Sequence, residues 1–296
     1  MAVHRIEIKD FCVFQGEFSA DFCRGVNIFI GGNGTGKTTL LRAIAIQPIF
    51  SYPYLNAGFH AFHNTPQLKK HNNVEVFPFP DGEYDKDRHI FIPVAEMLSH
   101  PEIYPMCQKY NLPYNNSETD VIENAMLPET NEITPNAAKV LDKISSIIGG
   151  TVRYENNTFY IGKISFPLEA SGFQKFGLLW KLLRNGLLEK GAVLFWDEPE
   201  ASINPELMAV LVDILLELQR GGVQIFIATH SEILASYFDV KRKDSDSVMF
   251  YSLYKDGKQI KADKNEKFNL LEPNHLTAEQ VKLYECEIEK GLGNGQ

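Results

Sequence analysis

The sequence predicts an α/β protein built around a mostly parallel β-sheet, and three observations carry that prediction. After residue 165, apolar runs of strand length alternate with helical patterns, which is typical of a parallel sheet covered by helices. A glycine-rich segment, residues 31–39 (GGNGTGKTT), directly follows the apolar run Val26–Ile30. Two later apolar runs end in polar residues, at Asp197 and at Thr229. The carboxyl ends of parallel strands meet at one edge of a sheet, so these polar residues are expected to lie together.

The first elements follow from short apolar patterns. Between residues 4 and 30 these patterns predict small strands joined by tight turns. Apolar residues at helical spacing predict a helix over Lys37–Ile46, which we expect Pro48 to end. A strand, the glycine-rich loop and a helix therefore follow one another.

The middle of the chain has a different character. Residues 48–130 are crowded with proline, asparagine, histidine and aromatic residues, which indicates an inserted, loop-rich subdomain. Thr134 before a proline is typical of a capped helix start, and Gly149 is typical of a helix end. The pair Asn156–Asn157 between two short apolar runs indicates a hairpin.

The later elements and the domain boundaries complete the prediction. The expected elements are a helix Gln174–Leu187, a strand Ala192–Trp196, a helix Pro205–Leu218, a strand Val223–Ala228, a helix Glu232–Phe238, a hairpin of Ser247–Tyr254 with Gln259–Lys261, and a terminal helix Leu276–Glu289. The expected domains are a first core part (1–47), an inserted subdomain ending in a helix and a hairpin (48–164), a second core part (165–262) and a tail (263–296).

Composition limits the class of protein. With 296 residues and 44% hydrophobic residues, the chain is long and apolar enough for a substantial core. Its net charge of -9 disfavours non-specific attachment to nucleic acid. The four cysteines are scattered without metal-site spacing, which favours reduced, mostly buried thiols. The first residues lack a signal-peptide pattern and the longest apolar stretch, Leu207–Leu218, contains two acids, so we expect a cytoplasmic protein without a membrane partner.

The glycine-rich segment matches the phosphate-loop pattern GxxxxGK[ST]. Glycines let successive backbone N–H groups converge on phosphate oxygens, and the following helix directs its positive end to the same place. In this pattern Lys37 reaches the outer phosphates and the Thr38 hydroxyl binds Mg²⁺. The residues expected to hold ATP are Gly31, Asn33, Gly34, Thr35, Gly36, Lys37, Thr38 and Thr39.

Two strand ends carry the residues suited to hydrolysis. Asp197 and Glu198 follow an apolar run; Asp197 is suited to hold Mg²⁺, and Glu198 to act as general base on the attacking water. An ordinary charged strand end is the alternative interpretation. His230 follows the next apolar run and is suited to bond the γ-phosphate, the alternative being a histidine near a helix cap. Lys37, Glu198 and His230 are therefore the catalytic candidates.

The order of these motifs resembles the ABC-type ATPases, in the non-transporter branch that includes RecF, SMC heads and the overcoming-lysogenization-defect (OLD) proteins, AAA family ATPases often found in DNA repair or anti-phage defence. The resemblance covers about residues 3–47 and 165–255. It implies an ABC-type P-loop NTPase core with a mostly parallel sheet, N-terminal antiparallel strands and an inserted loop-rich or helical subdomain.

The resemblance also implies a second subunit. The family's signature segment contacts the γ-phosphate of the partner's nucleotide, and the matching stretch here is 170–174 (ASGFQ), in which Ser171 and Gly172 are kept and a second glycine is replaced by Phe173. A simple helix cap at Ser171 is the alternative. Glu200, after the acid pair, resembles the RecF and OLD branch. One set of motifs in one chain implies a site shared with a second copy or a related chain.

The resulting hypothesis is a dimeric or higher-order ATP-hydrolysing switch that controls a protein effector. The alternatives are an ATP-loaded scaffold with little turnover and, less favoured, the nucleotide-binding subunit of a membrane transporter. DNA binding is supported only by two short basic clusters, 69–70 and 241–243. The family's linking glutamine is not assigned between Gln47 and Gln67, and for the adenine-stacking aromatic Phe14 is a weak candidate, better explained by core packing.

Overall fold

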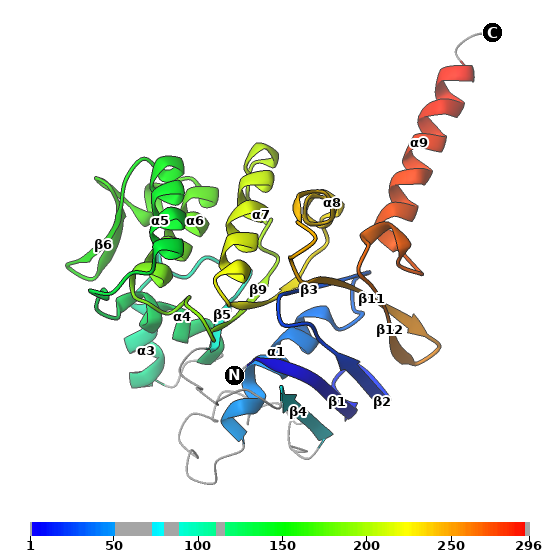
Figure 1. The fold of residues 1–296 in the computed structure, drawn as a ribbon, viewed down its shortest axis with the longest axis horizontal. Helices are drawn as coiled ribbons and strands as arrows, with labels where there is room; N and C mark the ends of the chain where they lie inside the picture. Colours follow the sequence, from blue (N-terminus) through cyan, green and yellow to red (C-terminus); the bar gives the residue numbers. More distant parts are fainter. Residues whose placement is uncertain (1, 51–72, 80–88, 111–115, 294–296) are drawn as a thin grey trace.

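A computed structural model describes residues 2–50, 73–79, 89–110 and 116–293 (Figure 1). Its central feature is a six-stranded sheet of strand order β12-β11-β3-β10-β9-β5. Every neighbouring pair in this sheet is parallel except β11 with β12, so the predicted mostly parallel sheet is confirmed. Its strands are β3 (Val26–Gly31), β5 (His89–Ile92), β9 (Val193–Asp197), β10 (Gln224–Ala228), β11 (Val248–Asp256) and β12 (Gln259–Asn265).

Two smaller antiparallel sheets flank the central one. The first has the order β2-β1-β4 and is formed by β1 (Val3–Phe11), β2 (Phe14–Asp21) and β4 (Val74–Pro78). The second has the order β6-β7-β8 and is formed by β6 (Val152–Glu155), β7 (Thr158–Ile161) and β8 (Ile164–Ser165). The N-terminal antiparallel strands expected from the sequence are therefore present.

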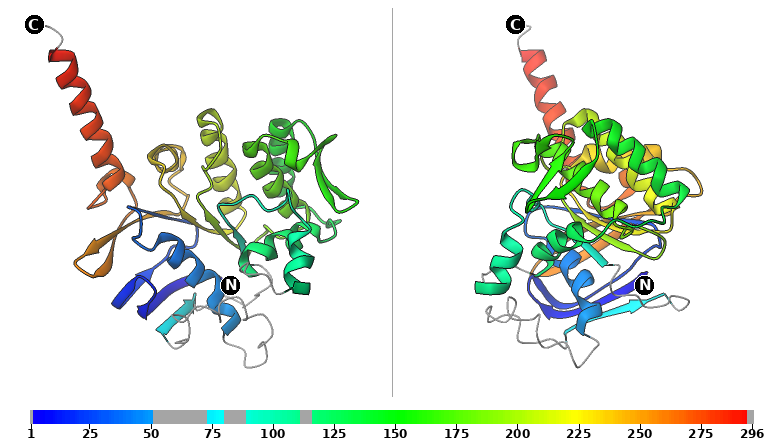
Figure 2. Two further views of the ribbon diagram at one scale, coloured as in Figure 1. Left: turned by 180° about the vertical axis from the view of Figure 1, so that it is seen from behind. Right: turned by 90° about the vertical axis from the view of Figure 1, so that its left-hand side faces the viewer.

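Helices cover both faces of the central sheet (Figure 1). Helices α5 to α8 lie on one face, whereas α1 and the sheet β2-β1-β4 lie on the other. Helix α9 projects away from the body of the protein (Figure 2). The helices are α1 (Lys37–Phe50), α3 (Ile103–Tyr110), α4 (Asn116–Met126), α5 (Pro135–Ile148), α6 (Ser171–Arg184), α7 (Pro205–Arg220), α8 (Glu232–Lys241) and α9 (His275–Gly293), with 3-10 turns η4 (Phe166–Leu168) and η5 (Phe268–Leu270).

The two faces of the central sheet bury separate hydrophobic cores. In β10, Ile225 and Ile227 belong to the core shared with α5 to α8. The alternate residues Phe226 and Ala228 belong to the core shared with α1 and β1. Because both faces are covered, the strand is apolar without interruption, which explains why it reads in the sequence as a continuous run.

Several local predictions are confirmed. The Thr134 hydroxyl accepts a hydrogen bond from the Ala137 amide at 3.2 Å and caps α5. Gly149 ends that helix in the left-handed conformation, with φ of 70°. Asn156 and Asn157 have φ of 49° and 57°, the two positive values that a type I′ hairpin turn requires, and they join β6 to β7.

Other boundaries differ from the prediction. Helix α1 continues past Pro48 to Phe50, because a proline this close to a helix end removes few backbone bonds. Helix α6 begins at Ser171 rather than Gln174, and it ends at Arg184, just before Gly186 with φ of 75°. Strands β4 and β5 come from the region predicted as an insertion, yet β4 pairs with β1 and β5 with β9.

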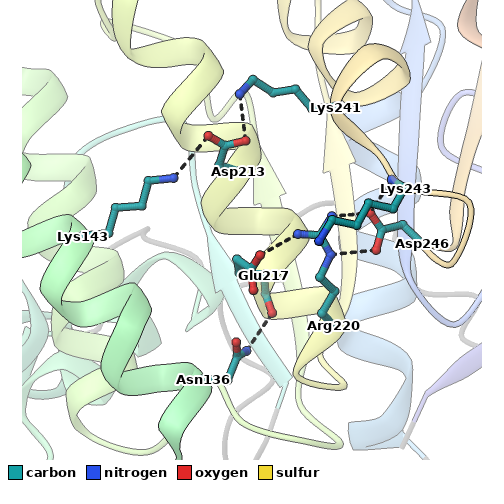
Figure 3. A network of polar contacts seen from close by, with 8 residues as sticks. All are labelled: Asn136, Lys143, Asp213, Glu217, Arg220, Lys241, Lys243 and Asp246. Atoms are coloured by element: carbon teal, nitrogen blue, oxygen red, sulfur yellow. Dashed lines mark hydrogen bonds and ion pairs between the residues drawn. The ribbon is translucent and has the colours of Figure 1, made fainter.

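Ion pairs join α7 to its neighbours (Figure 3). Asp213 of α7 binds Lys143 of α5 at 3.2 Å and Lys241 of α8 at 2.8 Å. At the end of α7, Arg220 donates two hydrogen bonds to the buried carboxylate of Asp246, of 2.8 and 2.5 Å. These hydrogen bonds from Arg220 hold the pKa of Asp246 below its usual value. Charged contacts thus fix the helical layer that covers one face of the sheet.

Candidate functional site

Three adjacent parallel strands bring the predicted residues to one edge of the central sheet. In register, Phe29 of β3 pairs with Ala228 of β10, and Ala228 pairs with Asp197 of β9. The glycine-rich loop follows β3, Glu198 follows β9, and His230 comes two residues after β10. The three motifs therefore begin at nearly the same level of the sheet, as expected from its parallel order.

Glycine is required in the loop at two positions for different reasons. A Cβ on Gly31 would lie 2.2 Å from the carbonyl oxygen of Leu253 on the neighbouring strand β11. A Cβ on Gly36, where φ is 88°, would lie 2.8 Å from Val13 in the β1–β2 turn and 2.9 Å from Phe14 at the start of β2. The loop is thus held between β11 and the β1–β2 turn, with no room for side chains at these positions.

Lys37 is buried inside this loop, with 6% of its surface exposed. Its ammonium donates hydrogen bonds to the carbonyl oxygens of Gly31 at 2.8 Å and Gly32 at 3.0 Å. Burial lowers the pKa of Lys37 to about 8, although the nearby carboxylates, Glu198 first, favour its charged form. An anion placed at the loop would restore the full charge of this lysine.

Thr38 and Asp197 place two oxygens side by side. The Thr38 hydroxyl donates to Asp197 Oδ1 at 3.1 Å. Asp197 is 2% exposed, and burial raises its pKa. Oxygen donors of this kind suit Mg²⁺. Within the described residues no group of three or more acidic, histidine or cysteine side chains is assembled for a metal.

Glu198 and His230 face each other beside this pair. His230 Nε2 lies 3.5 Å from Glu198 Oε1, and the two side chains are 37% and 34% exposed, so both reach solvent. Burial, followed by the charge of Lys37, lowers the pKa of His230 and favours its neutral form near neutral pH. Glu198 has φ of 47°, an uncommon value for a residue with a side chain.

Glu200 makes two contacts that the sequence did not reveal. Its Oε1 accepts hydrogen bonds from the Thr229 hydroxyl at 2.5 Å and from the His230 amide at 3.0 Å. The loop after β9 is therefore joined to the loop after β10. Glu200 and Thr229 are about thirty residues apart in the sequence, so this contact could not be predicted from it. Only the strand order brings the two loops together.

The segment 170–174 opens α6. Ala170 is the capping residue and its side chain makes no capping hydrogen bond, so the alternative of a simple cap at Ser171 is wrong. Ser171 is exposed in the first turn, whereas Gly172 is buried and a Cβ there would lie 3.5 Å from the carbonyl oxygen of Ser202. The exposed end of this helix is a position at which backbone N–H groups can receive an anion.

The other sequence candidates have varied outcomes. Phe14 is 1% exposed and packs on Phe18 with ring centroids 4.8 Å apart, so core packing is confirmed for it. In the basic cluster 241–243, Lys241 is paired with Asp213 and Arg242 with Asp239. Asn33 and Gly34 are exposed on the loop, while Thr39 is half-buried. Gln67, Lys69 and Lys70 lie outside the described residues, as does the side chain of Gln47.

All four cysteines are free, as expected, but the prediction that most are buried is wrong: Cys12 and Cys286 are exposed, and Cys23 and Cys107 are half-buried. In the described part of the chain, no helix combines the length and the apolar character needed to cross a bilayer.

Two family models match the chain. One is an AAA domain model named for the AbiEii toxin of a Type IV TA system, and it matches residues 100–236. The other is described as an AAA domain and matches residues 5–136. Together they extend from β1 to α8 and include all three motifs at the sheet edge.

Individual relatives agree with these models. The arginine transport ATP-binding protein ArtP of Haemophilus influenzae is 25% identical over 207 residues, which cover 69% of this chain and 70% of ArtP. A stretch of 46 residues, 16% of this chain and 12% of the relative, is 48% identical to the DNA replication and repair protein RecF of Heliobacterium modesticaldum.

Solved structures share the fold. An SMC head bound to the C-winged helix domain of ScpA has a TM-score of 0.54 at 13% identity, over 90% of this chain and 98% of that chain. MJ1267, an ATP-binding cassette of an ABC transporter, has a TM-score of 0.53 at 18% identity, over 96% and 99%. The α/β fold expected from the sequence is therefore confirmed.

Proposed function

Because this chain belongs to the AAA-type ABC ATPase domains, we propose that it binds ATP with Mg²⁺ and hydrolyses ATP to ADP and phosphate in a switch made of paired subunits. The observation that carries the proposal is the convergence of Lys37, the Thr38–Asp197 contact of 3.1 Å and the Glu198–His230 contact of 3.5 Å at one sheet edge. A protein that only bound ATP at this loop would not require Glu198 and His230 beside it.

Each residue has a role in this proposal. Lys37 leaves the carbonyl oxygens of its own loop and binds the outer phosphates. Thr38 and Asp197 hold Mg²⁺, which when bound offsets the negative charge of the phosphates. Glu198 accepts a proton from the attacking water, and its partial exposure gives that water access. His230, favoured as a neutral ring, donates a hydrogen bond to the outer phosphate.

A second subunit completes the site in this proposal. Ser171 and Gly172 open α6, which packs among α4, α5 and the β6–β8 sheet, whereas the loop that holds phosphate leads into α1 on the other face. The exposed end of α6 is therefore offered to another chain, whose ATP it would contact. The partner is a second copy or a related chain, and the output is control of a protein effector of the defence or DNA-maintenance type.

Phosphate release and particle mass test this function together. We expect wild-type protein to release phosphate from ATP with Mg²⁺, and Glu198→Gln to bind ATP, lose turnover by roughly 100-fold or more and accumulate as a pair of subunits. The control is Glu132→Gln, an exposed acid away from the sheet edge, which should behave as wild type. Unchanged turnover in Glu198→Gln would refute the assigned base, and unchanged mass with ATP would refute ATP-driven pairing of identical chains.

Two other functions give different outcomes in the same assays. An ATP-loaded scaffold would bind ATP and pair without measurable turnover in the wild-type protein. A transporter subunit is favoured by the likeness to the transport protein ArtP, and it would be supported if the chain co-purified with a membrane protein from its own cells.

A further inference from the structure

A buried lysine, Lys175, lies directly behind the proposed catalytic base. It is in the second turn of α6 and is 6% exposed. Its ammonium donates a hydrogen bond of 2.9 Å to the carbonyl oxygen of Glu198 and one of 3.5 Å to that of Pro199. Burial lowers the pKa of Lys175 to about 8, so the fold retains this ammonium against a desolvation cost. Its contacts are with backbone at the end of β9, rather than with a surface carboxylate.

These contacts hold Glu198 in a backbone conformation that it would otherwise rarely adopt. Its φ of 47° lies in the left-handed region, which is unfavourable for a residue with a Cβ. Three hydrogen bonds fix it there: its amide donates to the Ala228 carbonyl at 2.8 Å, and its carbonyl accepts from the Ala201 amide at 3.1 Å and from Lys175. The direction of the Glu198 side chain follows from this backbone, so Lys175 acts on the base through its carbonyl.

The same helix carries the segment proposed to meet the second subunit. Ser171 and Lys175 are four residues apart and therefore lie on one side of α6, a single turn from each other. Between them, buried Gly172 packs against the backbone of Ser202 and Ile203 in the loop that follows Glu198. Movement at the exposed end of α6 must consequently displace Lys175 or the loop it holds.

We propose that Lys175 is a positioning residue that joins Ser171, where the partner's nucleotide would dock, to Glu198 in the site of its own chain. This inference rests on the proposed function. It adds that docking at one ATP site sets the orientation of the base at the other. The rate of ATP hydrolysis at each site of a pair would then depend on whether the other site holds ATP. No residue needs to touch both nucleotides for this coupling.

The first test replaces Lys175 by methionine, which keeps an unbranched side chain one atom shorter and removes the ammonium. The matched control is Lys181→Met on the same helix, where the lysine is 5% exposed and pairs with Glu129 at 3.0 Å, away from the sheet edge. We expect Lys175→Met to lower kcat roughly 10- to 100-fold while the Kd for ATP stays within about threefold, because the binding loop is untouched. Lys181→Met should keep the wild-type kcat, and Lys175→Arg should recover part of it, since guanidinium also donates to carbonyl oxygens.

The second test asks whether the two sites communicate. Chains are mixed with an excess of Lys37→Ala chains, so that each intact chain faces a partner without nucleotide. The rate per intact site should then fall roughly tenfold for wild type, relative to fully loaded pairs, and change little for Lys175→Met, which has already lost the connection. The same fall in both proteins would overturn the coupling.

Other outcomes separate this inference from the proposed function. Wild-type kcat in Lys175→Met overturns the inference alone, as does an equal loss of kcat in Lys181→Met. If Lys175→Met does not fold, Lys175→Gln decides, because its amide is uncharged and one bond shorter: a normal Kd with a kcat between wild type and Glu198→Gln supports positioning, and a wild-type kcat overturns it. A wild-type chain that releases no phosphate overturns the proposed function and with it the inference.

Discussion

Replacing Gly36 by alanine tests whether the β1–β2 turn restrains the phosphate loop. At this position φ is 88°, and the added Cβ would lie 2.8 Å from Val13 Cγ2 and 2.9 Å from Phe14 Cζ. Val13 is 39% exposed and has room to move, whereas Phe14 is 1% exposed and does not. The substitution therefore combines backbone strain with an overlap that only one neighbour can relieve.

The expected magnitude is the sum of these two effects. A residue with a Cβ in the left-handed region costs about 1–2 kcal/mol. Overpacking against a buried side chain adds about 1–3 kcal/mol, so Gly36→Ala should lower the free energy of unfolding by about 2–5 kcal/mol. Gly34→Ala is the matched control: φ is 72°, but its Cβ would meet only Lys255 Nζ at 3.5 Å, so we expect the backbone cost alone.

Urea unfolding without nucleotide, followed by tryptophan fluorescence, measures both variants. Gly36→Ala should be less stable than Gly34→Ala by at least about 1 kcal/mol. Adding Phe14→Leu to Gly36→Ala should recover part of that difference relative to Phe14→Leu alone, because it removes Phe14 Cζ, the buried atom that the new Cβ meets. Equal losses in the two glycine variants, or no recovery in the double variant, would refute the restraint of the loop by the β1–β2 turn.

Three further predictions concern charge. The affinity for ATP should be constant below pH 8 and fall about tenfold per pH unit above it, because binding must reprotonate Lys37, whose pKa is about 8 in the free protein. An affinity that does not change from pH 7 to 9.5, measured by calorimetry, would contradict this. Arg220→Met should lower the free energy of unfolding by about 3 kcal/mol at pH 7, since it leaves the buried Asp246 carboxylate without its charged partner. The loss should be smaller at pH 4, where the carboxylate becomes protonated, and thermal unfolding at both pH values checks this difference. His230→Ala should lower kcat roughly 10- to 100-fold with the Kd for ATP within about threefold, and an unchanged kcat in a phosphate-release assay would exclude its role.

The sequence was sufficient to predict those features whose structure depends on residues close together in the chain. A strand, a glycine-rich loop and a helix follow one another without interruption, so the phosphate loop was predictable from its own residues. The acids at the end of β9, Asp197 and Glu198, were predictable because parallel strands direct their carboxyl ends to one edge. The cap of α5 and the β6–β7 turn likewise depend on neighbours a few residues away.

Long-range contacts were not predictable from one sequence. Strand β5 has four residues and pairs with β9 across about a hundred positions, so its short apolar run gives no sign of its partner. Lys175 looks like an ordinary charge on a helix, because its burial depends on carbonyl oxygens that only the fold brings near. The contacts of Glu200 were equally unpredictable, because the groups that donate hydrogen bonds to it, the Thr229 hydroxyl and the His230 amide, follow another strand, β10.

The separate cores on the two faces of the central sheet have a consequence for local opening. Amide hydrogen exchange reports such opening, and contiguous packed units exchange together. One unit contains α1 and the sheet β2-β1-β4, the other contains α5 to α8, and β9 and β10 contribute alternate residues to both. Amides of β9 and β10 should therefore exchange only when the whole domain unfolds, while nucleotide at the phosphate loop should slow exchange first on the side of α1 and β1.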